Sequence, residues 1–149
     1  MSARVLIVEG RFHEHIANAL LDGATAALEA AGVQFERITV PGALEIPPTI
    51  AFASRVGEDD ADPFDGYVAL GCLIRDESLN FSVIAHESAR GLMELSLKQN
   101  LCIGNGILAM DTEEQALAHA ARDQLDMGGE AARACLALIN VRAKLWSRA

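Results

Sequence analysis

The chain has 149 residues, of which 51% are hydrophobic, and its formal net charge is −9 at pH 7. This length and composition predict one domain over residues 1–149, with a core that needs neither disulfides nor a structural metal. The negative charge argues against a nucleic-acid partner, because phosphate backbones repel an acidic surface. No apolar run approaches the roughly 18 residues of a membrane span and no signal-peptide pattern is visible, so we expect a cytoplasmic protein without a membrane partner.

Apolar residues alternate between continuous runs, typical of buried strands, and the spacing of one helix face. In chain order they predict a strand at 5–8, a helix over 16–31, a strand at 34–40, a helix from residue 44, a strand at 67–73, a helix over 83–97, a strand at 101–110, a helix from residue 112 and a last helix over about 129–146. Pro47 and Pro48 must lie in the first turns of the second helix.

Three further local features have sequence signals. The acidic segment 57–65 is typical of a solvated loop, and Gly104-Asn105-Gly106 is expected to interrupt the fourth strand. Thr112 and Gln115 have the spacing of a capping box at the start of the fourth helix.

Strands that alternate with helices, each nearly continuous in apolar residues, indicate a parallel sheet covered on both faces. The predicted fold class is therefore α/β, a three-layer α/β/α sandwich with a four-stranded parallel sheet, doubly wound and flavodoxin-like. Ligands of such sheets bind at the carboxyl ends of the strands. Polar, aromatic and glycine residues gather at these expected ends, at 10–12, 41–45, 74–80 and 105–106. The segment 71–81 is the most informative, although an ordinary strand-to-helix turn would show the same pattern.

Metal and cofactor signals are weak. The cysteines are odd in number and set among apolar neighbours, so they are interpreted as reduced core residues; they are Cys72, Cys102 and Cys135. His13 and His15 are two apart and would not share a helix face, so no metal site is predicted. The sequence 104–106 lacks the third glycine of a dinucleotide fingerprint.

Several segments resemble, in order and in register, the motifs of the lumazine synthase family. Arg11-Phe12-His13 resembles Arg-Phe-Asn, 40–47 resembles Val-Pro-Gly-Ala-Phe-Glu-Ile-Pro, and 69–81 resembles Ala-Leu-Gly-x-Val-Ile-Arg-Gly-Glu-Thr-x-His-Phe. Shorter matches follow at 87–92, 104–108, 114–116 and 128–132. The resemblance covers almost the whole chain.

The resemblance implies the penultimate step of riboflavin biosynthesis. In that step 5-amino-6-(D-ribitylamino)uracil condenses with 3,4-dihydroxy-2-butanone 4-phosphate to 6,7-dimethyl-8-ribityllumazine, with loss of phosphate and water. No cofactor is implied. The partners are these small-molecule substrates and further copies of the chain, in a pentamer or an assembly of pentamers with the site between adjacent subunits.

The resemblance also implies roles for residues of the pyrimidine site. Phe12 would stack on the pyrimidine, and backbone around Leu73 and Ile74 would bind its edge. Glu45, with Ala43 and Leu44 beside it, would accept hydrogen bonds from the ribityl chain. From the sequence alone the simpler interpretation of Phe12 is a core residue at the start of the first helix, and Glu45 is compatible with a carboxylate placed at a helix N-terminus.

For the phosphate, the resemblance implies that Glu77 and Ser78 hold the anion at a helix start, and that Arg75 positions the loop. Ser78 has the alternative role of an N-cap, and Arg75 that of a surface ion pair. His119 stands where relatives often have a phosphate-binding arginine, and a solvated helix residue is its alternative. Arg122, one helical turn later, would supply the missing cation.

The largest departure from the family is Asn80, at the position of its proton-transfer histidine. An amide orients a substrate by hydrogen bonds but does not exchange protons near neutral pH. Met127 replaces a lysine, Asp76 a glycine, and Asn105 the phenylalanine that many relatives contribute from the neighbouring subunit. A catalytically impaired paralogue that binds lumazine or flavin, or only assembles, is therefore an alternative. A monomeric flavin-binding electron-transfer module is a third.

Overall fold

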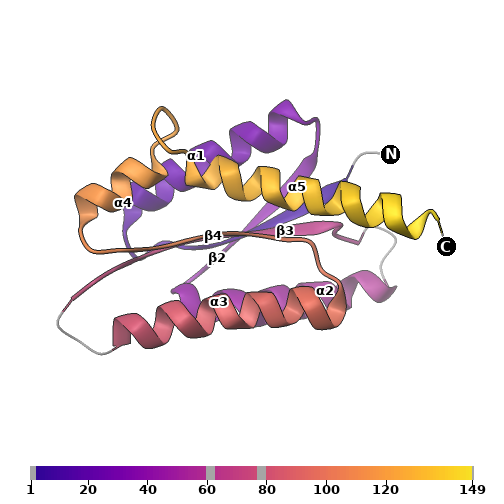
Figure 1. Cartoon of the computed structure of the whole chain (residues 1–149), viewed down its shortest axis with the longest axis horizontal. Coiled ribbons are helices and arrows are strands. Elements are labelled where there is room, and N and C mark those ends of the chain that lie inside the picture. The colour runs from indigo at the N-terminus through magenta and orange to yellow at the C-terminus, as the bar shows by residue number, and fades with distance from the viewer. Residues whose placement is uncertain (1–2, 60–62, 77–79, 149) are drawn as a thin grey trace.

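The computed structural model describes residues 3–59, 63–76 and 80–148. Strands and helices alternate along these residues (Figure 1). In chain order the elements are β1 (Arg4–Gly10), α1 (Glu14–Ala30), β2 (Gln34–Val40), the short 3₁₀ helix η1 (Ala43–Glu45), α2 (Ile46–Asp59), β3 (Gly66–Ile74), α3 (Asn80–Gln99), β4 (Ile103–Met110), α4 (Glu113–Ala120) and α5 (Met127–Trp146).

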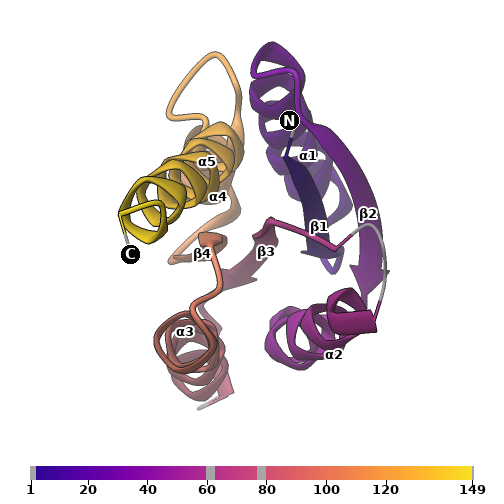
Figure 2. The same cartoon turned by 90° about the vertical axis from the view of Figure 1, so that its right-hand side faces the viewer.

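The four strands form one parallel sheet in the order β2-β1-β3-β4. Helices α1, α4 and α5 cover one face, and α2 and α3 cover the other (Figures 1 and 2). The predicted three-layer, doubly wound α/β fold is thus confirmed. Because β2 and β3 lie on opposite sides of β1, the strand order reverses between β1 and β3, which is where doubly wound sheets bind their ligands.

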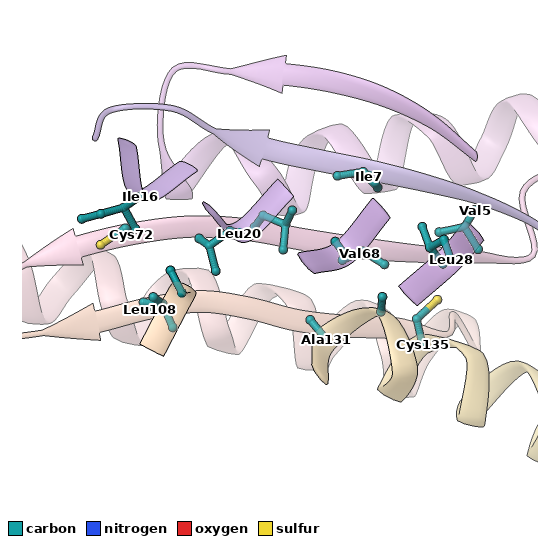
Figure 3. Packing of buried hydrophobic residues seen from close by; sticks show 14 of the residues in the cluster. Val5, Ile7, Ile16, Leu20, Leu28, Val68, Cys72, Leu108, Ala131 and Cys135 are labelled. Atoms are coloured by element: carbon teal, nitrogen blue, oxygen red, sulfur yellow. The ribbon is translucent and has the colours of Figure 1, made fainter. Parts of the chain in front are cut away.

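Each face of the sheet has its own apolar core. The larger core lies under α1 and α5, where Val5 and Val68 of the sheet meet Leu20 and Leu28 of α1 (Figure 3). The smaller core lies under α2 and α3 and includes Leu6, Val8, Ile46 and Leu92, among others. Burial on both faces explains why the residues of β1 and β3 read as uninterrupted apolar runs.

The predicted interruption of β4 is wrong, because 104–106 is continuous strand paired with 68–70 of β3. The reason is packing against α5. A Cβ on Gly104 would lie 1.8 Å from the carbonyl oxygen of Ala131. Glycine in this strand therefore marks the close approach of a helix rather than a break.

Two smaller expectations are corrected or refined. Residues 57–59, expected in a loop, belong to α2, which continues to Asp59, because an acidic composition is compatible with a helical turn as well as with a loop. Thr112 caps α4 as predicted, with its Oγ1 accepting from the Gln115 N–H at 3.1 Å. The Gln115 side chain completes no capping box, since it accepts from the Asp111 N–H instead. In the described part of the chain no helix is both long and apolar enough for a membrane crossing.

Gly104→Ala tests the contact between β4 and α5. We expect the free energy of unfolding to fall by about 1–3 kcal/mol or more, because the strand or the helix must move to admit the methyl group. Gly71→Ala is the matched control in β3, where the nearest atom would be 3.6 Å away. Chemical denaturation at one fixed protein concentration measures the free energy of unfolding of both variants. Equal stability of the two variants would contradict the packing argument.

Candidate active site

A cavity of about 400 Å³ lies at the carboxyl edge of the sheet, beside the point where the strand order reverses. Three chain connections meet there: β1 to α1, β2 to η1, and β3 to α3. The lining residues are Gly10, Phe12, His13, Gly42, Ala43, Leu44, Glu45, Gly71, Cys72, Leu73, Ile74, Asp76, Asn80, Phe81 and Ile84. Sequences far apart in the chain thus form one concave site, as expected for this fold.

Seven residues proposed from the sequence line this cavity: Phe12, Ala43, Leu44, Glu45, Leu73, Ile74 and Asn80. Phe12 is 81% exposed, so the alternative of a core residue is wrong. Glu45 is exposed and ends η1 directly before α2, so its carboxylate lies both at the cavity and near a helix N-terminus. Both of its sequence-based interpretations are compatible with this position.

The backbone edge of β3 is open at the cavity. The register of β1 with β3 ends at the pair Glu9 and Leu70, whereas β3 continues to Ile74. On its other side β3 stays paired with β4 up to Met110. In the described structure, Gly71–Ile74 therefore has no strand partner on the β1 side. Free N–H and C=O groups of this kind suit the edge of a planar polar ligand.

A buried carboxylate fixes the β1–α1 connection. Glu9 is 1% exposed, and its Oε1 accepts a hydrogen bond from Arg11 Nη1 at 2.6 Å. Its Oε2 accepts from Thr39 Oγ1 at 3.0 Å and lies 3.3 Å from Arg37 Nε. A charge removed from water requires such partners. Sequence reasoning missed this cluster, because Glu9 ends an apolar run and its partners on β2 are distant in sequence.

Arg11 extends the cluster to the first turns of α1. Its Nη2 donates to Glu14 Oε2 at 3.0 Å and to the Asn18 side chain. The hydrogen bond to Glu14, followed by that to Glu9, raises the pKa of Arg11 above its ordinary value. Arg11 therefore ties the end of β1 to α1 on either side of Phe12, which is held outside the core.

The ends of β1 and β2 approach closely at two glycines. A Cβ on Gly10 would lie 3.1 Å from the backbone carbon of Gly42, which is tighter than ordinary contact. Because neither glycine has a side chain, the two strand ends can come this close. The turn that carries Phe12 and the segment Ala43–Glu45 therefore line the same cavity. The Pro-Gly pair was predicted to end a strand, but its contact with Gly10 was not.

Two other cavity residues were not proposed for the site. His13 is the N-cap of α1 and makes no capping hydrogen bond with its side chain. Cys72 lies at the cavity wall, and burial and then the nearby Glu113 carboxylate raise the pKa of its thiol to about 11. The thiol is therefore protonated near neutral pH and a poor nucleophile. Cys72, Cys102 and Cys135 are free, buried thiols, which confirms the prediction of reduced core cysteines.

Arg75 lies beside the cavity rather than in its lining. Its Nε is 2.7 Å from Asp111 Oδ1, which is the surface ion pair that the sequence offered as an alternative. Its Cζ is also 4.7 Å from the ring centroid of Phe81, a lining residue in the first turn of α3. Arg75 therefore supports the helix start at which Asn80 lies, by a cation–π contact.

Three further proposed residues that the structure describes, Asn105, His119 and Arg122, do not line the cavity of their own chain. Asn105 is exposed on the edge strand β4, and its Oδ1 accepts from the Ile107 N–H at 2.9 Å. His119 Nδ1 is 2.8 Å from the Gln115 carbonyl. Arg122 is not one helical turn after His119, since α4 ends at Ala120; it lies 3.7 Å from Asp22 of α1.

Glu77 and Ser78 lie outside the described residues. Among the described lining residues there is no lysine or arginine, while Glu45 and Asp76 contribute carboxylates. Within the described ranges, no three His, Cys, Asp or Glu side chains come close enough to hold a metal ion. One chain thus presents an aromatic ring and an open backbone edge, but in its described part no strong cation for a phosphate.

Together the doubly wound sheet and the cavity at its reversal point define an α/β protein with a cavity of small-molecule size at the strand ends. Residues 2–143 match the model of the family described as 6,7-dimethyl-8-ribityllumazine synthase. The chain therefore belongs to this family.

Individual relatives agree with the family match. A 6,7-dimethyl-8-ribityllumazine synthase of Agrobacterium fabrum is 50% identical over 141 residues, covering 95% of each chain. One from Nitrobacter winogradskyi is 48% identical over 143 residues, covering 96% of this chain and 88% of the relative. A protein named 6,7-dimethyl-8-ribityllumazine synthase 1, from Mesorhizobium japonicum, is 48% identical over 146 residues, covering 98% and 89%.

Glu9→Ala tests the buried cluster behind Phe12. We expect the free energy of unfolding to fall by about 3–5 kcal/mol, because Arg11 and Arg37 lose a buried partner. Glu36→Ala is the control, since Glu36 is exposed and pairs with Arg4 at the surface; its loss should stay below about 1 kcal/mol. Denaturant titrations of both variants provide the comparison. Similar losses would show that burial of Glu9 has no special role.

Proposed function

We propose that this chain catalyses the condensation of 5-amino-6-(D-ribitylamino)uracil with 3,4-dihydroxy-2-butanone 4-phosphate to 6,7-dimethyl-8-ribityllumazine. The observation that supports it most directly is the pairing of the exposed Phe12 ring with the unpartnered edge of Gly71–Ile74 in one cavity. A planar, hydrogen-bonding heterocycle needs both features: a flat apolar face on one side and directed polar groups at its edge.

The cavity residues divide this task by their chemistry. Phe12 would stack on the pyrimidine, and the backbone at Leu73 and Ile74 would bind the polar ring edge. Glu45, exposed at the cavity next to Ala43 and Leu44, would accept hydrogen bonds from ribityl hydroxyls. Asn80, at the first turn of α3, would orient the second substrate or a water molecule.

For the phosphate we propose a site completed by a second copy of the chain. The described lining of one chain supplies carboxylates but neither lysine nor arginine. Asn105, His119 and Arg122 lie outside the cavity of their own chain, where they are accessible to a neighbour. In a pentamer, or an assembly of pentamers, His119 and Arg122 of one chain would complete the anion site near Glu77 and Ser78 of the next.

Exposed apolar side chains support an assembled form. Helix α3 exposes Val83, Met93 and Leu97, and α5 exposes Val141 and Leu145, among others. Apolar groups repeated along two helices of a small domain are typical of surfaces that pack against another protein. The cytoplasmic location expected from the sequence stays a prediction.

Turnover of both substrates, followed by the lumazine product, tests the activity. We expect measurable product from the unmodified chain and, for Phe12→Ala, a Kd for the lumazine about tenfold higher, since ring stacking contributes about 0.5–1.5 kcal/mol beyond area burial. The fold should be kept, because Phe12 is exposed. Inorganic phosphate is the internal control, and its affinity should not change. Lumazine binding without any turnover would instead indicate the impaired paralogue.

Mixing two inactive variants tests whether the site lies between subunits. Phe12→Glu damages the pyrimidine half, and His119→Glu places a carboxylate at the proposed phosphate half. When equal amounts are unfolded and refolded together, about a quarter of the sites combine two intact halves, so about a quarter of the activity should return. Light scattering of the unmodified chain should show a pentamer or larger species. No recovery on mixing, or a stable monomer, would contradict the shared site.

A further inference from the structure

The cavity contains an imidazole for which neither the family motifs nor the fold gives a role. His13 lines the same cavity as Asn80. No other histidine of the described chain lines it: His15, His86 and His119 all lie elsewhere. His13 is placed by the β1–α1 connection, the same connection that presents Phe12.

The ring of His13 is held by its surroundings rather than by helix capping. It is the N-cap of α1 with φ of −107°, yet its side chain makes no cap hydrogen bond. It meets the Phe12 ring edge-on, with centroids 5.0 Å apart and an interplanar angle of 77°. Its Nδ1 lies 3.8 Å from Glu113 Oε1, and the side chain is 21% exposed. A carboxylate beside one ring nitrogen is the arrangement that orients an imidazole for proton transfer at the other.

The other polar groups of the cavity are less suited to moving protons in both directions. The Cys72 thiol is held protonated by burial, and the Asn80 amide does not titrate near neutral pH. Glu45 and Asp76 carry carboxylates, and in the proposed function Glu45 binds the ribityl chain. An imidazole both gives and takes a proton near pH 7. The ionisable groups around it are Glu113 from α4, Cys72 from β3, Glu45 from η1, Asp76 after β3, and Arg11 and Glu14 of its own turn.

We propose that His13 transfers protons while the carbon–nitrogen bond forms, an inference that rests on the proposed condensation. The 5-amino nitrogen adds to the ketone carbon, and the carbonyl oxygen becomes a hydroxyl. His13 takes a proton from the nitrogen and returns it to that hydroxyl, which leaves as water when the imine forms. Both protons lost by the amine end on the departing oxygen, so His13 finishes in its starting state.

His13→Gln and His13→Ala provide the test in the assembled protein. For His13→Gln we expect kcat to fall by about 100-fold or more, while KM stays near that of the unmodified chain, because general acid–base catalysis contributes about 10²–10⁴-fold. The pH profile of kcat should lose a limb that the unmodified chain shows, because the group that exchanges the proton is gone. Imidazole added to His13→Ala should restore turnover in proportion to its concentration, which also shows that this variant is folded.

Matched controls separate the possible results. His15→Gln and His86→Gln remove imidazoles outside the cavity and should keep full turnover with an unchanged pH profile. If His13→Gln keeps its kcat, or loses activity only through KM with the pH limb intact, the inference is wrong while the proposed function stands. If the unmodified chain forms no product, the proposed function fails, and the role of His13 fails with it.

Discussion

The burial of one carboxylate at the end of β1 is the constraint on which the site depends. Glu9 is almost inaccessible to water, and its two oxygens are shared between Arg11, Arg37 and Thr39. Removing any one partner would weaken the compensation of a charge held in a poorly polarisable environment. The hydrogen bonds and ion pairs of Glu9 therefore stabilise both the pairing of β1 with β2 and the path of the chain after β1. Phe12 follows directly and remains outside the core as a result.

Strand register then determines what kind of ligand the cavity can hold. Because β3 extends past the end of β1, the edge at 71–74 is unpaired beside an aromatic ring, and the strand order reverses at this point. These features favour a flat polar molecule, but they supply no strong positive charge among the described lining residues. A phosphorylated second substrate consequently requires a cation from elsewhere. The same deficiency supports the proposed assembly, since in that proposal an isolated chain holds only part of the site.

Much of this could be predicted from the sequence because it follows from local patterns. Periodicity located the four strands and most of the helices, and a capping pattern located the start of α4, whereas η1 was not predicted. The family resemblance led to Phe12, Glu45 and Leu73. The error at Gly104 and the omission of Glu9 have a common cause, which is contact between distant segments. Gly104 was interpreted as a break in a strand, because the residue that requires a glycine there, Ala131, lies on a helix far along the chain. The carbonyl oxygen of Ala131 leaves no room for a side chain at position 104. Glu9 was missed for the same reason. The role proposed for His13 was missed as well, because it depends on Glu113 and on the cavity rather than on the neighbours of His13 in sequence.

Two contributions to catalysis, the positioning of the reactants and the transfer of protons, differ in size. This difference explains how residue 80 can differ from the family's histidine while the substrates are still held in place. Holding two reactants in a productive arrangement contributes up to about 7–11 kcal/mol to the lowering of a barrier, whereas proton transfer by one side chain contributes about 3–5 kcal/mol. In the proposed function the first contribution comes from the open edge of β3 and from Phe12, both held in place by the Glu9 cluster. The second requires only an imidazole that reaches the reacting atoms, and the cavity wall offers more than one position for it. A histidine at 13 and an asparagine at 80 therefore preserve the chemistry as long as the connection after β1 keeps its geometry, which makes the residues that hold this connection more important than any single titrating group.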